Sequence, residues 1–413
     1  MKLSRNVSSG EVTAAILWFR LFLSGDLEKK LRSFEAEGQN QPLLRQYYRE
    51  TFKLEYALDR LIKETKSGQP IPVHPSFSEA INFAVTFARV YQNLSAKGKK
   101  RLTGILQNSF AQTYGMRPLA FELMVAGHYL GKNCDVRFMD LEDKANFEFL
   151  VSKDGDEIEV ECKAISADGG RNIDQKGICT VGERVRAIVT NFNDLSSRIL
   201  TIKIRKRLSD VTSDALHALY TAVPKVLHGE PNISHPEFDL TLEIKPEFVL
   251  SPESIEESDV KKFVGQKVGG LGRHVLLHAH KGSRNIICAV FESETPDQVL
   301  EFISKRAAKA GTQFSHHKPS VVAMQIADMP PSALKELLDM PGVGTQKIAQ
   351  NLFEGPPKRP HVNAIAFSVL PEPELFTKPG PEISNISSLV TMIRNPDAKF
   401  PSQTIDSGNP FKD

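Results

Sequence analysis

The segment that organises the fold reads Glu157-Ile158-Glu159-Val160-Glu161-Cys162-Lys163-Ala164. Its polar and apolar residues alternate, which is the period of a half-buried β-strand. Because side chains two residues apart on a strand point the same way, Glu161 and Lys163 share one face, about 7 Å apart along the chain. Such a pair can serve phosphodiester hydrolysis: the carboxylate can hold a divalent metal, while the lysine orients or deprotonates water and stabilises charge on the phosphate.

The segments on either side of this strand predict an α/β arrangement. A second strand over residues 146–151 leads into it through residues 153–156, whose Asp154-Gly155 pair is a strong hairpin signal. The remaining elements are expected as a helix over 118–130, a strand over 134–139, a helix over 181–191 and a strand over 199–204. The predicted order is therefore helix, three strands, helix, strand.

This order, with Glu-x-Lys on the third strand, resembles the PD-(D/E)xK nuclease superfamily, which has a restriction-endonuclease-like αβββαβ core. In that family the Glu and Lys of the third strand and an acid at the start of the second strand form the site, and a Glu of the first helix often helps. Glu161 and Lys163 match by position, and Glu122 falls on the first helix. The resemblance implies a nuclease that hydrolyses DNA with Mg²⁺ (or Mn²⁺), in restriction, anti-phage defence or DNA repair.

The acid of the second strand is where the sequence departs from the family. A hairpin centred on Asp154-Gly155 places Lys163 near Asn146, where the family has Asp, and a neutral amide oxygen holds a hard cation more weakly. In one interpretation Asp143, or else Asp140, is turned inward by a bulge and binds the metal with Glu161. In the other, Asn146 occupies the position, and the chain is a catalytically weakened DNA-binding or scaffold subunit. We expect a working site with Asp143; an RNA-directed nuclease is a third interpretation.

Length and composition predict two or three domains in an ordinary globular protein of 413 residues, with a net charge of only +2. We expect a helical N-terminal region over 1–114, the nuclease core over 115–230 and a mixed α/β region over 231–413. The helical region is a candidate for homo-oligomer formation or for binding a defence-system partner protein. The chain shows no export signal and no apolar run that would span a membrane, and its four cysteines suit a reducing cytoplasm.

Nucleic-acid contacts must come from local groups, since the net charge is nearly neutral. Arg171 and Lys176 follow the central strand and are candidate phosphate contacts or ordinary loop charges. Residues 333–349 resemble a helix-hairpin-helix element, which uses a Gly-x-Gly turn to bring backbone N–H groups to a phosphate. Its candidate residues are Gly342, Gly344 and Lys347. A basic cluster is either a solvated helix start or a phosphate contact, and consists of Lys97, Lys99, Lys100 and Arg101.

Overall fold

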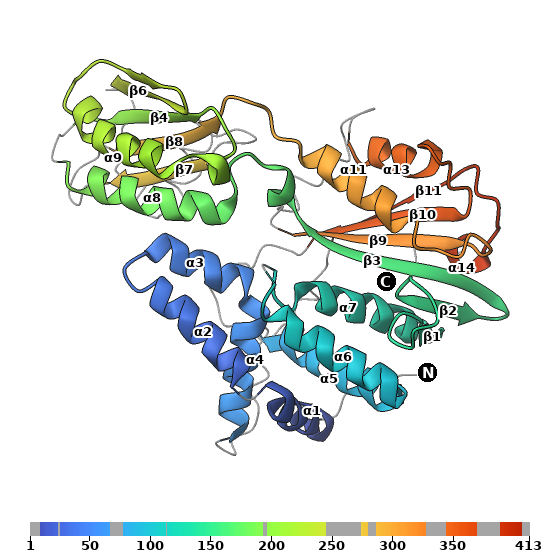
Figure 1. The fold of residues 1–413 in the computed structure, drawn as a ribbon. Helices are drawn as coiled ribbons and strands as arrows, with labels where there is room; N and C mark the ends of the chain where they lie inside the picture. The colour runs from blue at the N-terminus through green and yellow to red at the C-terminus, as the bar shows by residue number, and fades with distance from the viewer. Residues whose placement is uncertain are drawn as a thin grey trace, which may run out of the picture. The chain divides into compact units, whose positions relative to one another are not determined.

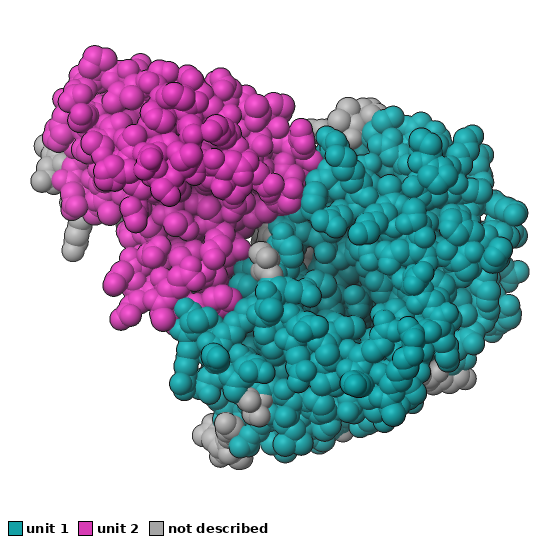
Figure 2. Space-filling model, viewed as in Figure 1, with its two compact units in different colours: residues 1–33, 49–167, 300–413 teal, residues 34–48, 168–299 magenta. Residues whose placement is uncertain are grey.

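The computed structural model describes residues 9–23, 25–66, 77–112, 114–192, 196–244, 274–279, 286–327, 344–369 and 389–406. The chain divides into two compact units (Figure 2). Unit 1 is formed by residues 1–33, 49–167 and 300–413, and unit 2 by residues 34–48 and 168–299. Each unit has its own sheet, so the structure is mixed α/β, as the sequence predicts.

The N-terminal region is helical, as predicted. Its helices are α1 (Ser9–Leu23), α2 (Asp26–Glu37), α3 (Pro42–Thr51), α4 (Lys53–Lys66), α5 (Ser78–Asn93) and α6 (Ala96–Ser109). Helix α1 packs against α5 through aromatic rings, with the Phe19 and Phe87 ring centroids 4.8 Å apart in an edge-on arrangement. None of the described helices combines the length and the apolar character needed to cross a membrane.

Unit 1 is built on a six-stranded sheet with the order β1-β2-β3-β9-β10-β11 (Figure 1). Its strands are β1 (Asp135–Phe138), β2 (Phe149–Lys153), β3 (Asp156–Ser166), β9 (Ser320–Ala327), β10 (Val362–Val369) and β11 (Leu389–Arg394). Its further helices are α7 (Arg117–Gly131), α11 (Val299–Ala310), α13 (Thr345–Glu354) and α14 (Gln403–Asp406). Figure 1 shows α7 beside β3 on one side of the sheet, with α11 and α13 on the other.

The β2–β3 hairpin forms at the predicted turn. Asp154 and Gly155 have φ values of 51° and 87°. Two consecutive residues with positive φ are the requirement of a type I′ turn, whose twist matches that of the strands it joins. The hairpin pairs Phe149 with Val160 and Lys153 with Asp156. Strand β2 begins at Phe149, three residues later than predicted, so Asn146 precedes the strand.

On the side of β3 opposite β2, the neighbouring strand in the sheet is β9. It runs parallel to β3, and Glu161 pairs with Val322. The elements of unit 1 therefore follow the order α7, β1, β2, β3, α11, β9, which is helix, three strands, helix, strand. The residues between β3 and α11 belong to unit 2. The predicted second helix and fourth strand of the core do form, as α8 (Gln175–Thr190) and β4 (Arg198–Ile204), but β4 lies in the other sheet. The expected contiguous core over 115–230 is thus replaced by two separate units.

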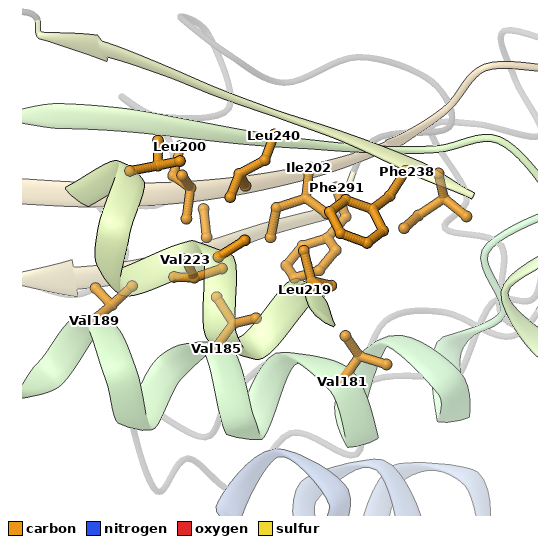
Figure 3. Close-up of a cluster of buried hydrophobic side chains, with 14 of the residues drawn as sticks. Val181, Val185, Val189, Leu200, Ile202, Leu219, Val223, Phe238, Leu240 and Phe291 are labelled. Atoms are coloured by element: carbon orange, nitrogen blue, oxygen red, sulfur yellow. The ribbon is translucent and has the colours of Figure 1, made fainter. Parts of the chain in front are cut away.

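Unit 2 has a five-stranded sheet with the order β5-β6-β4-β8-β7. Its other elements are η2 (Ala167–Gly170), η3 (Leu208–Asp210), α9 (Ser213–Leu227), β5 (Ile233–His235), β6 (Phe238–Ile244), β7 (His274–Ala279) and β8 (Ile286–Ser293). Val181, Val185 and Val189 recur every four residues on α8 and point into the core shared with the sheet (Figure 3). Leu200 and Ile202 meet them from β4, so this unit has a hydrophobic core of its own.

Candidate active site: an acidic cluster around Lys163

Lys163 of β3 stands between two carboxylates. Its Nζ donates a short hydrogen bond to Oε1 of Glu161 and lies 3.6 Å from Oε1 of Glu148. The Glu161 side chain is fully buried, whereas 26% of the Lys163 side chain is exposed. Glu161 and Lys163 are therefore brought together on one face of the strand, as the alternating sequence predicts, and the lysine can still reach solvent.

Glu148 is the residue that sequence reasoning missed. It immediately precedes β2, and the hairpin register that pairs Phe149 with Val160 sets Glu148 opposite Glu161. Its other oxygen, Oε2, accepts a hydrogen bond from the backbone N–H of Cys162 at 2.9 Å, which holds the carboxylate against β3. The signal was present in the sequence, because a hairpin turn at Asp154-Gly155 already implies this register. An acid therefore does stand beside Glu161 at the start of the second strand, two residues after Asn146.

Two further acids extend the cluster. Glu122 comes from α7, as predicted, and Asp140 from the turn that follows β1. Burial and then the neighbouring carboxylates of Glu148 and Asp140 raise the pKa of Glu122 well above its ordinary value. Burial, followed by the charge of Glu148, raises the pKa of Asp140 to about 6. Four carboxyl groups from four different segments thus form one cluster that is linked by electrostatic repulsion. The ammonium of Lys163 attracts the carboxyls of Glu122, Glu148 and Glu161.

Glu161 also bears an electrostatic cost in this cluster. Burial, and then the adjoining carboxyl of Glu148 with which it can share a proton, raise the pKa of Glu161 to about 10. When both groups are ionised, Oε2 of Glu161 is a buried oxygen to which no described residue donates a hydrogen bond. Burial lowers the pKa of Lys163, but the charges of Glu148 and Glu161 outweigh this effect and leave it raised. With all four carboxyls ionised, the cluster has more negative charge than Lys163 neutralises.

A divalent cation would supply the missing positive charge. The donors are carboxylate oxygens, which are the ligands of hard cations such as Mg²⁺ and Mn²⁺. The buried Oε2 of Glu161 has an unused lone pair for such a cation, and Glu148 adjoins it. Over the described residues, no three or more His, Cys, Asp or Glu side chains are already arranged as a metal centre. The residues fit a cation by chemistry, with Glu161 and Glu148 as the ligands and Lys163 beside them.

The prediction that Asp143 binds the metal is not supported by its position. Its backbone has φ of 56°, in the turn before β2, and its carboxylate pairs with Lys97 and with Arg101 Nη1, the latter at 2.8 Å. The hydrogen bond from Lys97 and the charge of that lysine, followed by the hydrogen bond and charge of Arg101, lower the pKa of this exposed carboxyl. The structure brings Asp140, the alternative, into the cluster instead. Asn146 is exposed, and its backbone oxygen accepts a hydrogen bond from Nε2 of Gln313 at 3.0 Å, so the metal-acid position is not occupied by this amide.

The predicted nucleic-acid contacts interact with side chains other than those of the cluster. Arg171 and Lys176 belong to unit 2, where Arg171 pairs with Asp168 at 3.3 Å and Lys176 with Glu37 at 3.7 Å. Gly342 and the first half of the predicted helix-hairpin-helix lie outside the described residues. Gly344 precedes α13, and the exposed Lys347 on that helix hydrogen-bonds Gln350 at 3.2 Å.

Comparison of the chain with protein-family models, with curated proteins and with solved structures gave no match. What the site does is therefore inferred from its own geometry and charge. Three features bear on it directly. They are the Glu161–Lys163 pair, the opposed carboxyl of Glu148 and the order of the elements that carry them.

Proposed function

We propose that this chain is a metal-dependent nuclease that hydrolyses DNA phosphodiester bonds. The observation that carries the proposal is the buried Glu161 carboxyl, which shares Lys163 with Glu148 and has an oxygen without a donor among the described residues. A carboxylate pair beside an ammonium is what metal-assisted phosphodiester hydrolysis needs. The element order α7, β1, β2, β3, α11, β9 adds support, because it follows the αβββαβ order of the PD-(D/E)xK superfamily.

Each residue would have a separate task. Glu161 and Glu148 would bind Mg²⁺ (or Mn²⁺), with Asp140 and Glu122 as outer acids that hold water or orient the ligands. The bound cation would polarise the scissile phosphate and lower the pKa of a water molecule. Lys163 would position the attacking water and stabilise the negative charge that develops on the phosphate. Because Lys163 is partly exposed, its ammonium is accessible to a phosphate from solvent.

A cleavage assay tests the proposal. Plasmid DNA is incubated with the full chain and Mg²⁺ or Mn²⁺, beside the variants Glu161→Gln and Lys163→Ala. The matched control is Glu157→Gln, since Glu157 lies on the same face of β3 but pairs with Lys318 and Arg137 outside the cluster. We expect the control to cut like the parent and both site variants to lose about 100-fold or more of the rate.

The same assay separates the alternative, a scaffold or DNA-binding subunit of the same fold. In that case Lys163 would act only as a structural ion pair. The parent would then bind DNA but cut it with neither metal. Cleavage that survives in both site variants would place the chemistry in another part of the chain. Nicking, linearisation and degradation of the plasmid would be distinguished on the same gel. Restriction, anti-phage defence and repair are settings that agree with such an activity.

A further inference from the structure

Unit 1 has an open groove between helices α1, α5 and α6, and its lining includes none of the residues of the acidic cluster. The groove measures about 590 Å³. It is lined by Phe22, Tyr91, Ala96, Lys99, Lys100, Thr103, Gly104 and Gln107. Two aromatic rings and two lysines thus face one space, and no acidic residue is part of this lining.

The aromatic side of the groove is held in place by its neighbours. The ring of Tyr91 lies edge-on to Trp18 and Phe22, with centroids 4.8 and 5.4 Å apart, and is stacked on the buried Phe87. Its outer face is accessible, because what lies over it is the flexible end of Lys99, with Nζ 5.5 Å from the ring centroid. A planar group can displace that ammonium and stack on a ring that is already ordered.

The two lysines differ from the other members of their basic cluster. Lys97 and Arg101 neutralise Asp143. Within the described part of the chain, no ion pair with an acidic residue is formed by Lys99 or Lys100, and the Nζ of Lys99 lies over the π-face of Tyr91. The basic cluster therefore consists of two pairs. Lys97 and Arg101 make ion pairs within the protein, whereas Lys99 and Lys100 line the groove and present positive charge to a ligand.

We propose that this groove binds single-stranded nucleic acid, with a base stacked on Tyr91 or Phe22 and the backbone phosphates near Lys99 and Lys100. An ordered aromatic surface beside cations that lack acidic partners is the arrangement used to bind single strands without sequence preference. In a duplex the base faces are covered by their neighbours, so only a single strand can use the rings. The choice of nucleic acid as the ligand rests on the proposed nuclease function. The groove would then hold an unpaired stretch of the substrate.

Gly104 provides the sharpest test. It lies in the middle of α6 and lines the groove, and a Cβ built there meets nothing within 4 Å. Gly104→Gln would place in the groove a side chain that the helix accommodates, and it would stabilise the helix because glycine is a poor helix former. Gly127→Gln is the matched control, since Gly127 lies inside α7, its Cβ would also meet nothing, and it is not part of the groove.

Binding is measured by fluorescence anisotropy of labelled oligothymidylate and oligouridylate with the full chain in EDTA, so that cleavage does not interfere. We expect both glycine variants to melt at or above the temperature of the parent. Gly104→Gln should lose about fivefold or more of the affinity for the single strand, corresponding to one stacked base, and Gly127→Gln should lose none. Equal affinity of Gly104→Gln and the parent would overturn the proposal. A difference between the DNA and RNA strands would identify the sugar that the groove prefers.

A charge-reversal pair tests the lysines. Lys99→Glu/Lys100→Glu should weaken single-strand binding and reduce its dependence on salt concentration. The control double variant, Lys305→Glu/Lys309→Glu, changes two exposed lysines of α11 by the same charge and should bind like the parent. Equal loss of single-strand affinity in the two double variants would overturn the proposal that the groove binds single strands. Binding of a duplex oligonucleotide as tight as that of the single strand would overturn it as well. Failure of the parent to cut DNA would instead overturn the nuclease and leave the binding result unaffected.

Discussion

Glu148 and Glu161 lie opposite each other at the base of the β2–β3 hairpin, and the Nζ of Lys163 interacts with both. The turn at Asp154-Gly155 determines this opposition, because it sets the register of the two strands. Burial, and then the nearby carboxyl of Glu148, raise the pKa of Glu161 to about 10. A local feature of the chain, a two-residue turn, thus creates a charged centre several residues away.

The first prediction concerns the pH dependence of stability. Since the pKa of Glu161 is raised from 4.5 to about 10, the folded chain retains a proton that the unfolded chain has lost. The stability linked to that proton is complete below about pH 4.5 and is lost as the pH rises toward 10. Without divalent metal, we therefore expect the free energy of unfolding to fall by about 1.4 kcal/mol for each pH unit, on the order of 4 kcal/mol between about pH 6 and pH 9. Urea titrations at each pH measure it.

Glu161→Gln should reduce this slope, because the amide has no proton to lose, and the slope that is left comes from groups such as Glu122, whose pKa is also raised. Glu157→Gln should keep it, since the hydrogen bond from Lys318 is the first cause that lowers the pKa of Glu157 and places its titration at acid pH. A slope that is unchanged in Glu161→Gln would show that another group dominates the pH response.

The second prediction concerns the turn. Gly155 has φ of 87°, a conformation that side chains with a Cβ rarely adopt. Gly155→Val should therefore destabilise the chain by about 1–2 kcal/mol and weaken the opposition of Glu148 to Glu161. Asp154→Gly is the control, because glycine accepts the positive φ of 51° at that position. Urea unfolding midpoints compare the two, and equal stability of the Gly155→Val protein and the parent would contradict the turn's role.

The third prediction separates two aspartates that lie three residues apart. Asp140 is half-buried in the cluster, and its pKa is raised to about 6 by burial and by Glu148, whereas Asp143 is exposed and paired with Lys97 and Arg101. Asp140→Asn should lower plasmid cleavage by about 10-fold or more, the cost of losing a group that orients metal ligands. Asp143→Asn should leave the rate unchanged. The opposite ranking would restore Asp143 as the metal ligand.

Much of the site follows from local sequence. The alternation of residues 157–164 places Glu161 and Lys163 on one face, and the Asp-Gly pair forms the hairpin it predicts. The same register implies Glu148, which is missed when the search is confined to Asn146 and the aspartates before it. The position of Asp143 does not follow from local sequence, because its partners, Lys97 and Arg101, lie more than forty residues earlier in the chain and leave no local signal.

The composition of the sheet depends on contacts between residues distant in sequence. Strand β9 pairs with β3 although residues 168–299 intervene, and a parallel pair needs a connection that sequence periodicity does not reveal. Within that connection α8 and β4 repeat the helix-strand order expected of the core. A prediction from the order of the elements alone therefore places β4 in the sheet of β3, whereas it lies in the other sheet. Within unit 1, the helix and strand that follow the first three strands are α11 and β9 instead of α8 and β4.

The most direct test of the account is a calorimetric titration of the metal-free chain with Mn²⁺ near neutral pH. We predict binding to the parent and to Glu157→Gln, and its loss in Glu148→Gln and in Glu161→Gln alike, because the two opposed carboxyls form one site. Mn²⁺ binding that persists in both site variants would contradict a cation site between Glu148 and Glu161. So would a loss of binding that is no greater in these variants than in the control.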